Sequence, residues 1–258
     1  MKIYRAYAKV NIFLKITGMR GSYHEIISRF VRVDSLYDEM NFEEKKESEF
    51  KIIGNFSCQT EQNTIYKAYL ALKEAVPSES LEKLMQSYAI KVDKKIPAFA
   101  GLGGGSSNAA TYLKMCNEVL HLGLSQNELA KIGMKVGADV AFFIYEYASA
   151  NVSGIGEVVE EFKEPPLKFE IFTPKIEIST PKIYKSYREN FYEPIDAPEM
   201  QRFKKISSKD ALDNMGIDEA NDLFKPALQE YKELKNHYKY GYHFSGSGSS
   251  FFRVKEEG

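Results

Sequence analysis

The chain has 258 residues, of which 43% are hydrophobic and 28% are charged, as in an ordinary globular enzyme of one large or two modest domains. Its 35 basic and 36 acidic residues give a formal net charge of -1, which excludes a general attraction to nucleic acid or anionic membranes. Cys58 and Cys116 are too few for a disulfide framework or a zinc site. No signal peptide or apolar window of 18 residues is visible. We therefore expect a cytoplasmic protein with no membrane or nucleic-acid partner.

The first segment alternates between apolar and polar residues. Even-numbered positions from Tyr4 to Ile16 are mainly apolar, whereas Arg5, Lys9 and Asn11 have the other parity. A period of two residues predicts a β-strand, with Lys9 and Asn11 on the same face. A lysine on the polar face of a strand is usually solvated, and this remains the alternative to a functional role for Lys9.

Strand-like and helical segments follow one another without a regular βαβ rhythm. Strands are expected at 29–33, 50–53, 89–92 and 169–173, and helices at 63–76, 80–88, 106–120, 125–137, 209–214 and 220–237, before a final strand-turn-strand. This pattern predicts an α+β protein with two domains. Two prolines in Glu161–Pro166 mark the boundary, so we expect an N-terminal domain at residues 1–163 and a C-terminal domain at 164–258.

A glycine-rich segment lies between a predicted strand and a predicted helix. Glycines 101, 103, 104 and 105 allow positive φ and a close approach of the backbone to a ligand. Ser106 and Ser107 then begin the helix, whose first amides are unpaired and can bind a phosphate. No lysine follows as in a Walker loop, and Ser106 stands where a dinucleotide fingerprint requires glycine. We interpret the segment as a triphosphate cradle, with a flexible turn as the alternative.

A second loop of small residues, Phe244–Phe251, lies between two strand-like segments near the end of the chain. Alone it would be read as a hairpin turn or linker. Together with the first glycine-rich segment it suggests a ligand held between the two domains.

Asp139 precedes a strongly apolar run that begins at Val140. Its carboxylate either caps a helix beginning at Val140 or orients and deprotonates a substrate hydroxyl. In the second case, Lys9 would stabilise the negative charge of a phosphoryl-transfer transition state.

Tyr23 and His24 follow a glycine-containing turn at Gly18–Gly21. An aromatic ring beside a histidine can stack on a nucleobase and hydrogen-bond its edge. A partly buried Tyr-His pair with a structural role is the alternative.

Three segments together resemble the signatures of the GHMP kinase family, in family order: Ala6–Leu14, Pro97–Ser107 and Phe244–Phe251. The resemblance spans nearly the whole chain. It implies a two-domain fold with the active site in the cleft between domains and a ferredoxin-like C-terminal domain. Further matching segments, including Leu36–Asp38 and Asn221–Leu223, favour a member whose acceptor carries a cytidine diphosphate group.

The resemblance also implies the reaction and the site residues. ATP, accompanied by Mg²⁺, would phosphorylate the 2-hydroxyl of a cytidylyl-methylerythritol substrate in the non-mevalonate route to isoprenoid precursors, in a monomer or homodimer. Lys9 and Asp139 would be the catalytic pair. The implied substrate-binding residues are Asn11, Tyr23, His24, Thr180 and Tyr184. The implied ATP-binding residues are Asn63, Ile65, Pro97, Ala98, Phe99, Ala100, Gly101, Leu102, Gly103, Gly104, Gly105, Ser106 and Ser107. The third signature contributes Ser245, Gly246, Ser247 and Gly248.

Two alternatives remain open. One is a GHMP kinase that acts on mevalonate or homoserine, although such ligands have no base for Tyr23 and His24 to recognise. The other is a nucleotide- or sugar-binding regulator that has kept the fold without catalysis, although the chain retains both Lys9 and Asp139.

Overall fold

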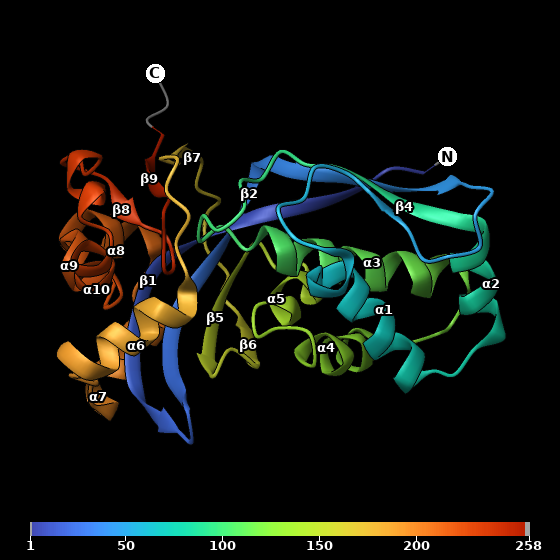
Figure 1. Cartoon of the computed structure of the whole chain (residues 1–258). Coiled ribbons are helices and arrows are strands. Elements are labelled where there is room, and N and C mark those ends of the chain that lie inside the picture. Colours follow the sequence, from blue (N-terminus) through green and yellow to red (C-terminus); the bar gives the residue numbers. More distant parts are fainter. Residues whose placement is uncertain (1, 256–258) are drawn as a thin grey trace. The chain divides into compact units, whose positions relative to one another are not determined.

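The computed structural model describes residues 2–255 (Figure 1). These residues form two compact units. Unit 1 contains residues 2–8, 34–96 and 104–146, and unit 2 contains residues 9–33, 97–103 and 147–255. Two long strands, β1 (Tyr4–Arg20) and β2 (Tyr23–Glu44), contribute residues to both units. Both units contain helices and strands, which confirms the predicted α+β class. The predicted domain boundary between residues 163 and 164 stays a prediction.

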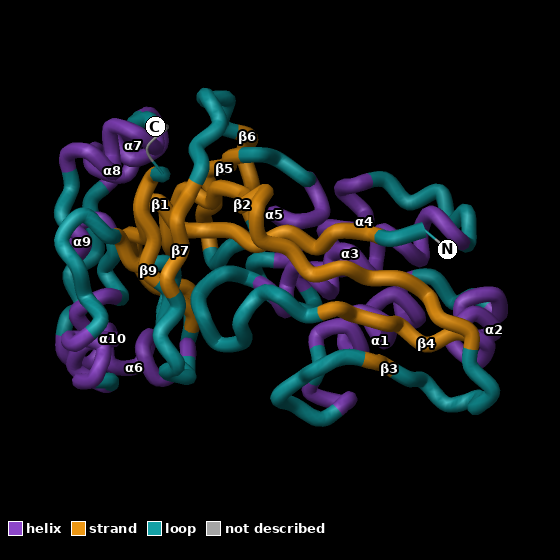
Figure 2. Tube along the Cα trace, turned by 90° about the horizontal axis from the view of Figure 1, so that it is seen from above, coloured by secondary structure: helices purple, strands orange, loops and turns teal. Residues whose placement is uncertain are grey.

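Unit 1 combines a small sheet with five α-helices. The second half of β2 is antiparallel to β4 (Tyr88–Asp93), which is parallel to the short strand β3 (Ile52–Ile53), and Figure 2 shows β3 and β4 side by side. The helices are α1 (Thr64–Ala75), α2 (Glu79–Ser87), α3 (Gly104–Val119), α4 (Gln126–Met134) and α5 (Val140–Tyr145). Helix α3 contacts α1, α4 and α5, and α4 also contacts α1 and α5.

Unit 2 contains two groups of strands. The first half of β2 is antiparallel to β5 (Ser149–Gly154), which is antiparallel to β6 (Val158–Glu161). A separate sheet has the order β7 (Phe169–Phe172), β9 (Phe251–Val254), β8 (His243–Phe244). The helices of this unit are α6 (Thr180–Asn190), α7 (Ala197–Lys205), α8 (Ser208–Asn214), α9 (Ile217–Ala220) and α10 (Phe224–Glu230).

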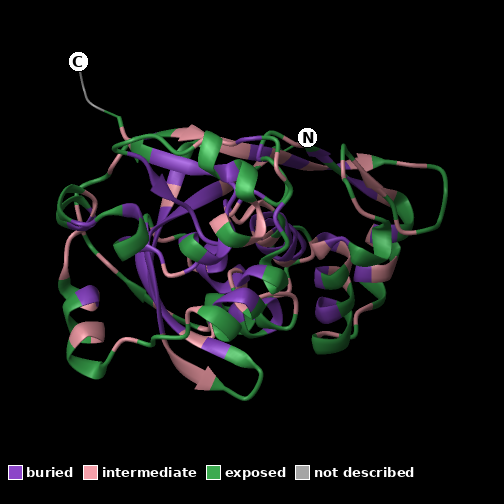
Figure 3. Ribbon diagram, turned by 60° about the vertical axis from the view of Figure 1, so that its left-hand side comes forward, coloured by how far each residue is buried: buried purple, intermediate pink, exposed green. Residues whose placement is uncertain are grey.

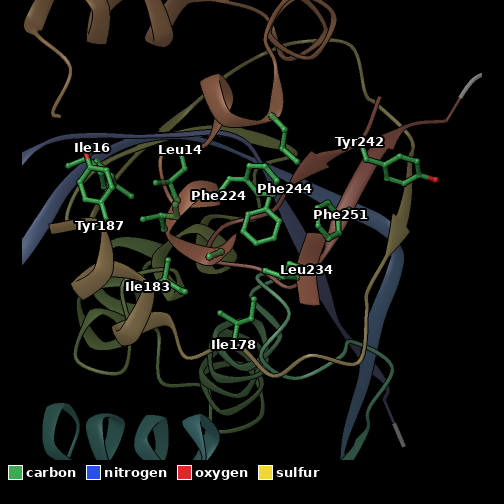
Figure 4. Packing of buried hydrophobic residues seen from close by; sticks show 14 residues of the cluster. Leu14, Ile16, Ile178, Ile183, Tyr187, Phe224, Leu234, Tyr242, Phe244 and Phe251 are labelled. Atoms are coloured by element: carbon green, nitrogen blue, oxygen red, sulfur yellow. The ribbon is translucent and has the colours of Figure 1, made fainter. Parts of the chain in front are cut away.

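A large apolar cluster fixes the interior of unit 2. It joins Leu14 of β1, Ile183 of α6, Phe224 of α10 and the two hairpin residues Phe244 and Phe251 (Figure 4). Burial of apolar area is the main favourable contribution to folding. Figure 3 shows the complementary pattern, with exposed residues concentrated in loops and on the outer turns of helices. The cluster therefore holds β1 and the C-terminal hairpin in a fixed arrangement.

Several predicted elements are confirmed. The alternating first segment is β1, and the helices predicted at 63–76, 80–88 and 106–120 correspond to α1, α2 and α3. Ser125 and Glu128 form the expected capping box of α4. The final strand-turn-strand is the antiparallel pair β8 and β9.

Other elements differ from the prediction. The helix expected at 220–237 is broken into α9, α10 and a 3₁₀ turn at Lys232–Asn236. Asn221 leaves the helical conformation, with φ -137° and ψ 107°, and its side chain bonds to the hairpin loop instead. Strand β5 was not predicted, because its six residues, Ser149–Gly154, are small and only Ala150 and Val152 are apolar, although nearly all are buried. Helices α6 and α7 were also not predicted.

Candidate active site

Lys9 is a buried lysine, with 3% of its surface exposed. Its ammonium donates to Asn11 Oδ1 at 2.5 Å and to the Gly101 carbonyl at 3.1 Å, and it lies 4.5 Å from the ring centroid of Phe30. A buried ammonium is tolerated only where such partners replace water. The interpretation of Lys9 as a solvated surface residue is therefore wrong, and its charge lies against the glycine-rich segment.

Asn11 holds the Lys9 ammonium in place. Lys9 and Asn11 share one face of β1 because they are two residues apart. The Asn11 amide group donates to Ser28 Oγ at 2.9 Å, and Ser28 in turn donates to the Phe13 carbonyl. This chain of donors orients Asn11 Oδ1 toward Lys9.

The glycine-rich segment and the C-terminal loop contact each other within unit 2. Ser245 Oγ donates to the Gly101 carbonyl at 3.0 Å, and the Ser250 amide donates to the Ala100 carbonyl at 3.1 Å. Gly101 has a φ of 73°, and a Cβ atom there would lie 2.0 Å from the Ser245 carbonyl oxygen. Only glycine fits this position. Ala100 and Gly101 of the first loop thus bond to Ser250 and Ser245 of the second, and the Gly101 carbonyl also accepts from Lys9.

Asn221 anchors the C-terminal loop from the other side. Its amide nitrogen donates to the carbonyls of Phe244 and Gly246, both at 2.9 Å, and its oxygen accepts from the Leu223 amide at 2.9 Å. Sequence reasoning noted the Asn221–Leu223 segment without giving it a role. Asn221 lies within the segment expected to be a helix at 220–237, so the sequence carried no local signal for this role.

Residues 97–103 of the glycine-rich segment differ in exposure. Pro97, Ala98 and Phe99 are exposed, whereas Ala100 and Leu102 are buried. Phe99 has a φ of 53°, and 52% of the residue is exposed. Left-handed backbone costs a non-glycine residue about 1–2 kcal/mol.

The remaining part of this segment, Gly104 to Ser107, is the first turn of α3 in unit 1. Thr64 Oγ1 donates to the Gly105 carbonyl at 2.7 Å, and a Cβ on Gly104 would lie 2.9 Å from Ile96 Cγ2. The first amides of a helix have no intrahelical acceptor, so this turn can bind an anion.

Asp139 directly precedes α5 in unit 1 and is half-buried. It has helical dihedral angles, φ -75° and ψ -10°, and among the described residues its side chain accepts no capping hydrogen bond from α5. The capping interpretation of Asp139 is therefore wrong.

His24 lies among aromatic residues of α6. Its ring centroid is 5.0 Å from that of Tyr184 and 5.8 Å from that of Tyr187. Its Nε2 atom is buried, and within residues 2–255 it has no hydrogen-bond partner. Burial, with a smaller effect of Arg188, lowers the pKa of His24, so the ring is neutral at pH 7 and offers one donor and one acceptor.

The other predicted substrate residues lie in different surroundings. Tyr23 precedes His24 in β2, and 65% of it is exposed. This exposure differs from the alternative of a partly buried Tyr-His pair with a structural role. Thr180 begins α6, and its hydroxyl lies 2.7 Å from Ser247 Oγ of the C-terminal loop. The structure therefore brings His24 together with Tyr184, and Thr180 together with Ser247.

Asn63 and Ile65 lie at the start of α1 in unit 1. The Asn63 side chain caps this helix by accepting from the Ile65 amide at 2.9 Å. Both residues are buried. A role for them near a nucleoside stays a prediction.

Across residues 2–255, no helix has the length and apolar character needed to cross a membrane. In the same part of the chain, no three His, Cys, Asp or Glu side chains are grouped as metal ligands.

Comparisons with known proteins show the family of the chain. Residues 63–147 match the family described as "GHMP kinases N terminal domain". The 4-diphosphocytidyl-2-C-methyl-D-erythritol kinase of Sulfurimonas denitrificans is 73% identical over 261 residues, covering 100% of this chain and 98% of that protein. The protein with the same name from Campylobacter jejuni subsp. doylei is 42% identical, covering 97% and 99%.

Solved structures give the same result. A crystal structure of 4-(cytidine 5'-diphospho)-2C-methyl-D-erythritol kinase is 27% identical, with a TM-score of 0.73 and coverage of 99% of this chain and 90% of that one. Mevalonate kinase from L. major is 12% identical, with a TM-score of 0.61 and coverage of 100% and 88%, which shows a shared fold only. From the identity over the whole chain, we conclude that the protein belongs to the 4-diphosphocytidyl-2-C-methyl-D-erythritol kinases of the GHMP kinase family.

Proposed function

We propose that the chain transfers the γ-phosphoryl group of ATP to the 2-hydroxyl of 4-diphosphocytidyl-2-C-methyl-D-erythritol, giving the 2-phosphate and ADP in the non-mevalonate isoprenoid pathway. The acceptor oxygen forms the new bond to phosphorus as the bond to the ADP oxygen breaks. The observation that carries this proposal is the buried Lys9 ammonium, held against the Gly101 carbonyl. A fixed cation beside a phosphate-binding loop supplies the charge stabilisation on which phosphoryl transfer depends.

We assign Asp139 the role of proton acceptor for the 2-hydroxyl. Its carboxylate is half-buried and is not used to cap α5. Positioned carboxylates of this kind accelerate proton transfer by about 10²–10⁴-fold. Lys9 would stabilise the charge that develops on the transferred group. Lys9 and Asp139 belong to different units, so their joint action remains the hypothesis made from the sequence.

The cytidine part of the substrate would be recognised around His24. A neutral imidazole with a buried, unused nitrogen suits the hydrogen-bonding edge of a base. Tyr184 packs beside it, and Tyr23 offers an exposed ring for stacking. Asn11 and Thr180 would contact other parts of the substrate, next to Lys9 and Ser247 respectively.

ATP would be bound by the glycine-rich segment from Pro97 to Ser107, with Asn63 and Ile65 near its nucleoside. Mg²⁺ is expected to accompany the nucleotide and to neutralise charge on the phosphates. It usually binds through one or two carboxylates together with substrate phosphates, so it needs no preformed cluster of three ligands. We also propose that the protein is a monomer or a homodimer and that it acts in the cytoplasm.

The competing interpretations differ in the acceptor. A mevalonate or homoserine kinase would have no use for the unpaired nitrogen of His24. A regulator without activity would have no use for a buried Lys9 beside a phosphate loop, because burying an ammonium carries a cost.

The direct test is an assay of ADP release by the purified protein with ATP and Mg²⁺. We expect release to require the cytidylyl-methylerythritol substrate, and cytidine diphosphate to inhibit competitively against that substrate. ATP consumption that is independent of the acceptor, or binding of both ligands with no ADP formed, would contradict the proposal.

A further inference from the structure

We propose that Asp38 is a positioning residue that joins the two ends of the glycine-rich segment 97–107 and so sets the affinity for ATP. This inference rests on the proposed function of that segment. Asp38 lies in β2 and is fully buried. It contacts neither substrate nor nucleotide in this account, and it acts through the backbone that it holds.

Asp38 fixes the residues directly before the segment. Its Oδ1 atom accepts from the backbone amides of Lys95 at 2.7 Å and Ile96 at 2.8 Å. Two amides on one carboxylate oxygen are charge-assisted hydrogen bonds, which are stronger than neutral ones. The chain therefore enters the segment from a fixed point.

The other oxygen of Asp38 fixes the residue directly after the segment. Oδ2 accepts from Asn108 Nδ2 at 2.8 Å, and Asn108 is a buried residue in the second turn of α3. Lys94 bonds to both residues, since its ammonium donates to Asp38 Oδ2 at 2.5 Å and to Asn108 Oδ1 at 3.0 Å. One carboxylate thus bonds residues on both sides of positions 97–107. Asp38 and the residues that it bonds all belong to unit 1.

A glycine-rich segment needs such an anchor. Glycine loses more conformational freedom on ordering than any other residue, and four of the residues from 101 to 105 are glycine. If the ends are free, ATP binding must supply the ordering free energy, which weakens the observed affinity. If the ends are fixed beforehand, less of the binding energy is consumed. The anchor should therefore act on ATP affinity and leave the affinity for the acceptor unchanged.

The chain offers a matched control in Glu164. This carboxylate is also largely buried, and it accepts from the Ser208 amide at 2.8 Å and from the hydroxyls of Ser149 and Ser208 at 2.6 Å. It holds parts of unit 2 that lie outside the glycine-rich segment. Glu164→Gln therefore reports what loss of a buried, hydrogen-bonded carboxylate does to stability alone.

The test uses Asp38→Asn, Asn108→Asp and the double exchange D38N/N108D. In Asp38→Asn, the side-chain amides of residues 38 and 108 face each other, and Lys94 loses its ion pair with Asp38. In Asn108→Asp, the carboxylates of residues 38 and 108 face each other and repel. The double exchange restores one amide and one carboxylate, with the carboxylate still within reach of Lys94. A double-mutant cycle then measures the coupling between the two positions.

We expect each single variant to raise the KM for ATP, and the Kd for a non-hydrolysable ATP analogue measured by calorimetry, at least tenfold. The KM for the acceptor should stay within twofold. The double exchange should return the KM for ATP and the Kd for the ATP analogue to within about threefold of the values of the unaltered protein. Glu164→Gln should lower the melting temperature and leave these two constants unchanged.

The inference is overturned if D38N leaves the ATP constants within twofold, if it raises the KM values of ATP and acceptor equally, or if the double exchange is as impaired as the worse single variant. Calorimetric binding keeps this test separate from that of the reaction. An unaltered protein that binds the ATP analogue but releases no ADP with the cytidylyl substrate would remove the proposed function and leave the anchor intact.

Discussion

Single residues in this chain owe their roles to how completely they are removed from water. The two-residue period placed Lys9 and Asn11 on one face of β1, but it does not show whether that face is exposed to solvent. The structure buries it and pairs Lys9 with Gly101, 92 residues away. Likewise, the position of Asp139 before Val140 suggested a helix cap, and only the local geometry shows that no cap is made. The sequence could identify these residues as candidates. It could not predict their burial or their hydrogen-bond partners, because these depend on contacts between distant parts of the chain.

Asp139→Asn tests the role of the carboxylate. The amide keeps the shape of the side chain but cannot accept the hydroxyl proton, so turnover should fall by at least about 100-fold. Calorimetry should show an unchanged Kd for the ATP analogue, because the glycine-rich segment is intact. Turnover within a few-fold of the unaltered protein would exclude Asp139 from the mechanism.

The lowered pKa of His24 predicts a pH dependence of stability. Burial disfavours the charged ring in the folded state, whereas in the unfolded chain the pKa is about 6.5. Below that pH the unfolded state binds more protons, so the free energy of unfolding decreases as pH falls toward the folded-state pKa.

Denaturation of the unaltered protein and of His24→Gln between pH 7.5 and pH 5 measures this effect. The variant should lose less stability over that range than the unaltered protein. His243, whose pKa is also lowered by burial, contributes equally to both proteins and cancels in the comparison. Identical slopes would show that His24 titrates normally in the folded state.

Elements with strong local signals were predicted well, and elements determined by tertiary contacts were not. The period of β1 and the capping box of α4 are encoded within a few residues. In contrast, the predicted helix at 220–237 is interrupted because Asn221 bonds to Phe244 and Gly246. Strand β5 alternates polar and apolar residues, but it has only six residues and its apolar positions are the small Ala150 and Val152, so its local signal is weak.

Asn221→Leu should disturb the C-terminal loop, since the two carbonyls lose their shared donor. We expect kcat/KM to fall at least tenfold, with a loss of about 1–3 kcal/mol in the free energy of unfolding. Asn117→Leu is the control, because Asn117 also bonds backbone, at Leu124 in unit 1, with two 2.9 Å hydrogen bonds. It should cost comparable stability and leave kcat/KM within twofold. Equal kinetic losses in both variants would mean that Asn221 acts on stability alone.

At the scale of the whole molecule, the α+β class was predictable because helical and strand patterns are interspersed without a regular βαβ rhythm, but the composition of the two units was not. Each unit assembles segments from separate parts of the sequence. In unit 2, Arg29 shows how such segments are tied: its Nε donates to Asn151 Oδ1 at 2.8 Å and Nη2 to the Ile206 carbonyl at 3.1 Å. Its Nη1 atom lies 3.6 Å from Glu164 Oε2.

Removing Arg29 should destabilise the protein strongly. Burial lowers its pKa to about 10, so it is charged at pH 7, and Arg29→Met leaves Glu164 as a buried charge without its counterion. We expect a loss of about 3–5 kcal/mol, seen as a lower urea midpoint. The double variant R29M/E164M removes both charges and should lose less than R29M. A double variant that is less stable than R29M would contradict this account of the pair.

The central claim is that the chain phosphorylates an acceptor that carries cytidine diphosphate. Comparing kcat/KM for 4-diphosphocytidyl-2-C-methyl-D-erythritol, mevalonate and homoserine, with ATP and Mg²⁺ fixed, tests it directly. Since buried polar groups left unpaired discriminate strongly against smaller ligands, we predict a preference of at least about 100-fold for the cytidylyl substrate. Equal or greater kcat/KM with mevalonate or homoserine would contradict the claim.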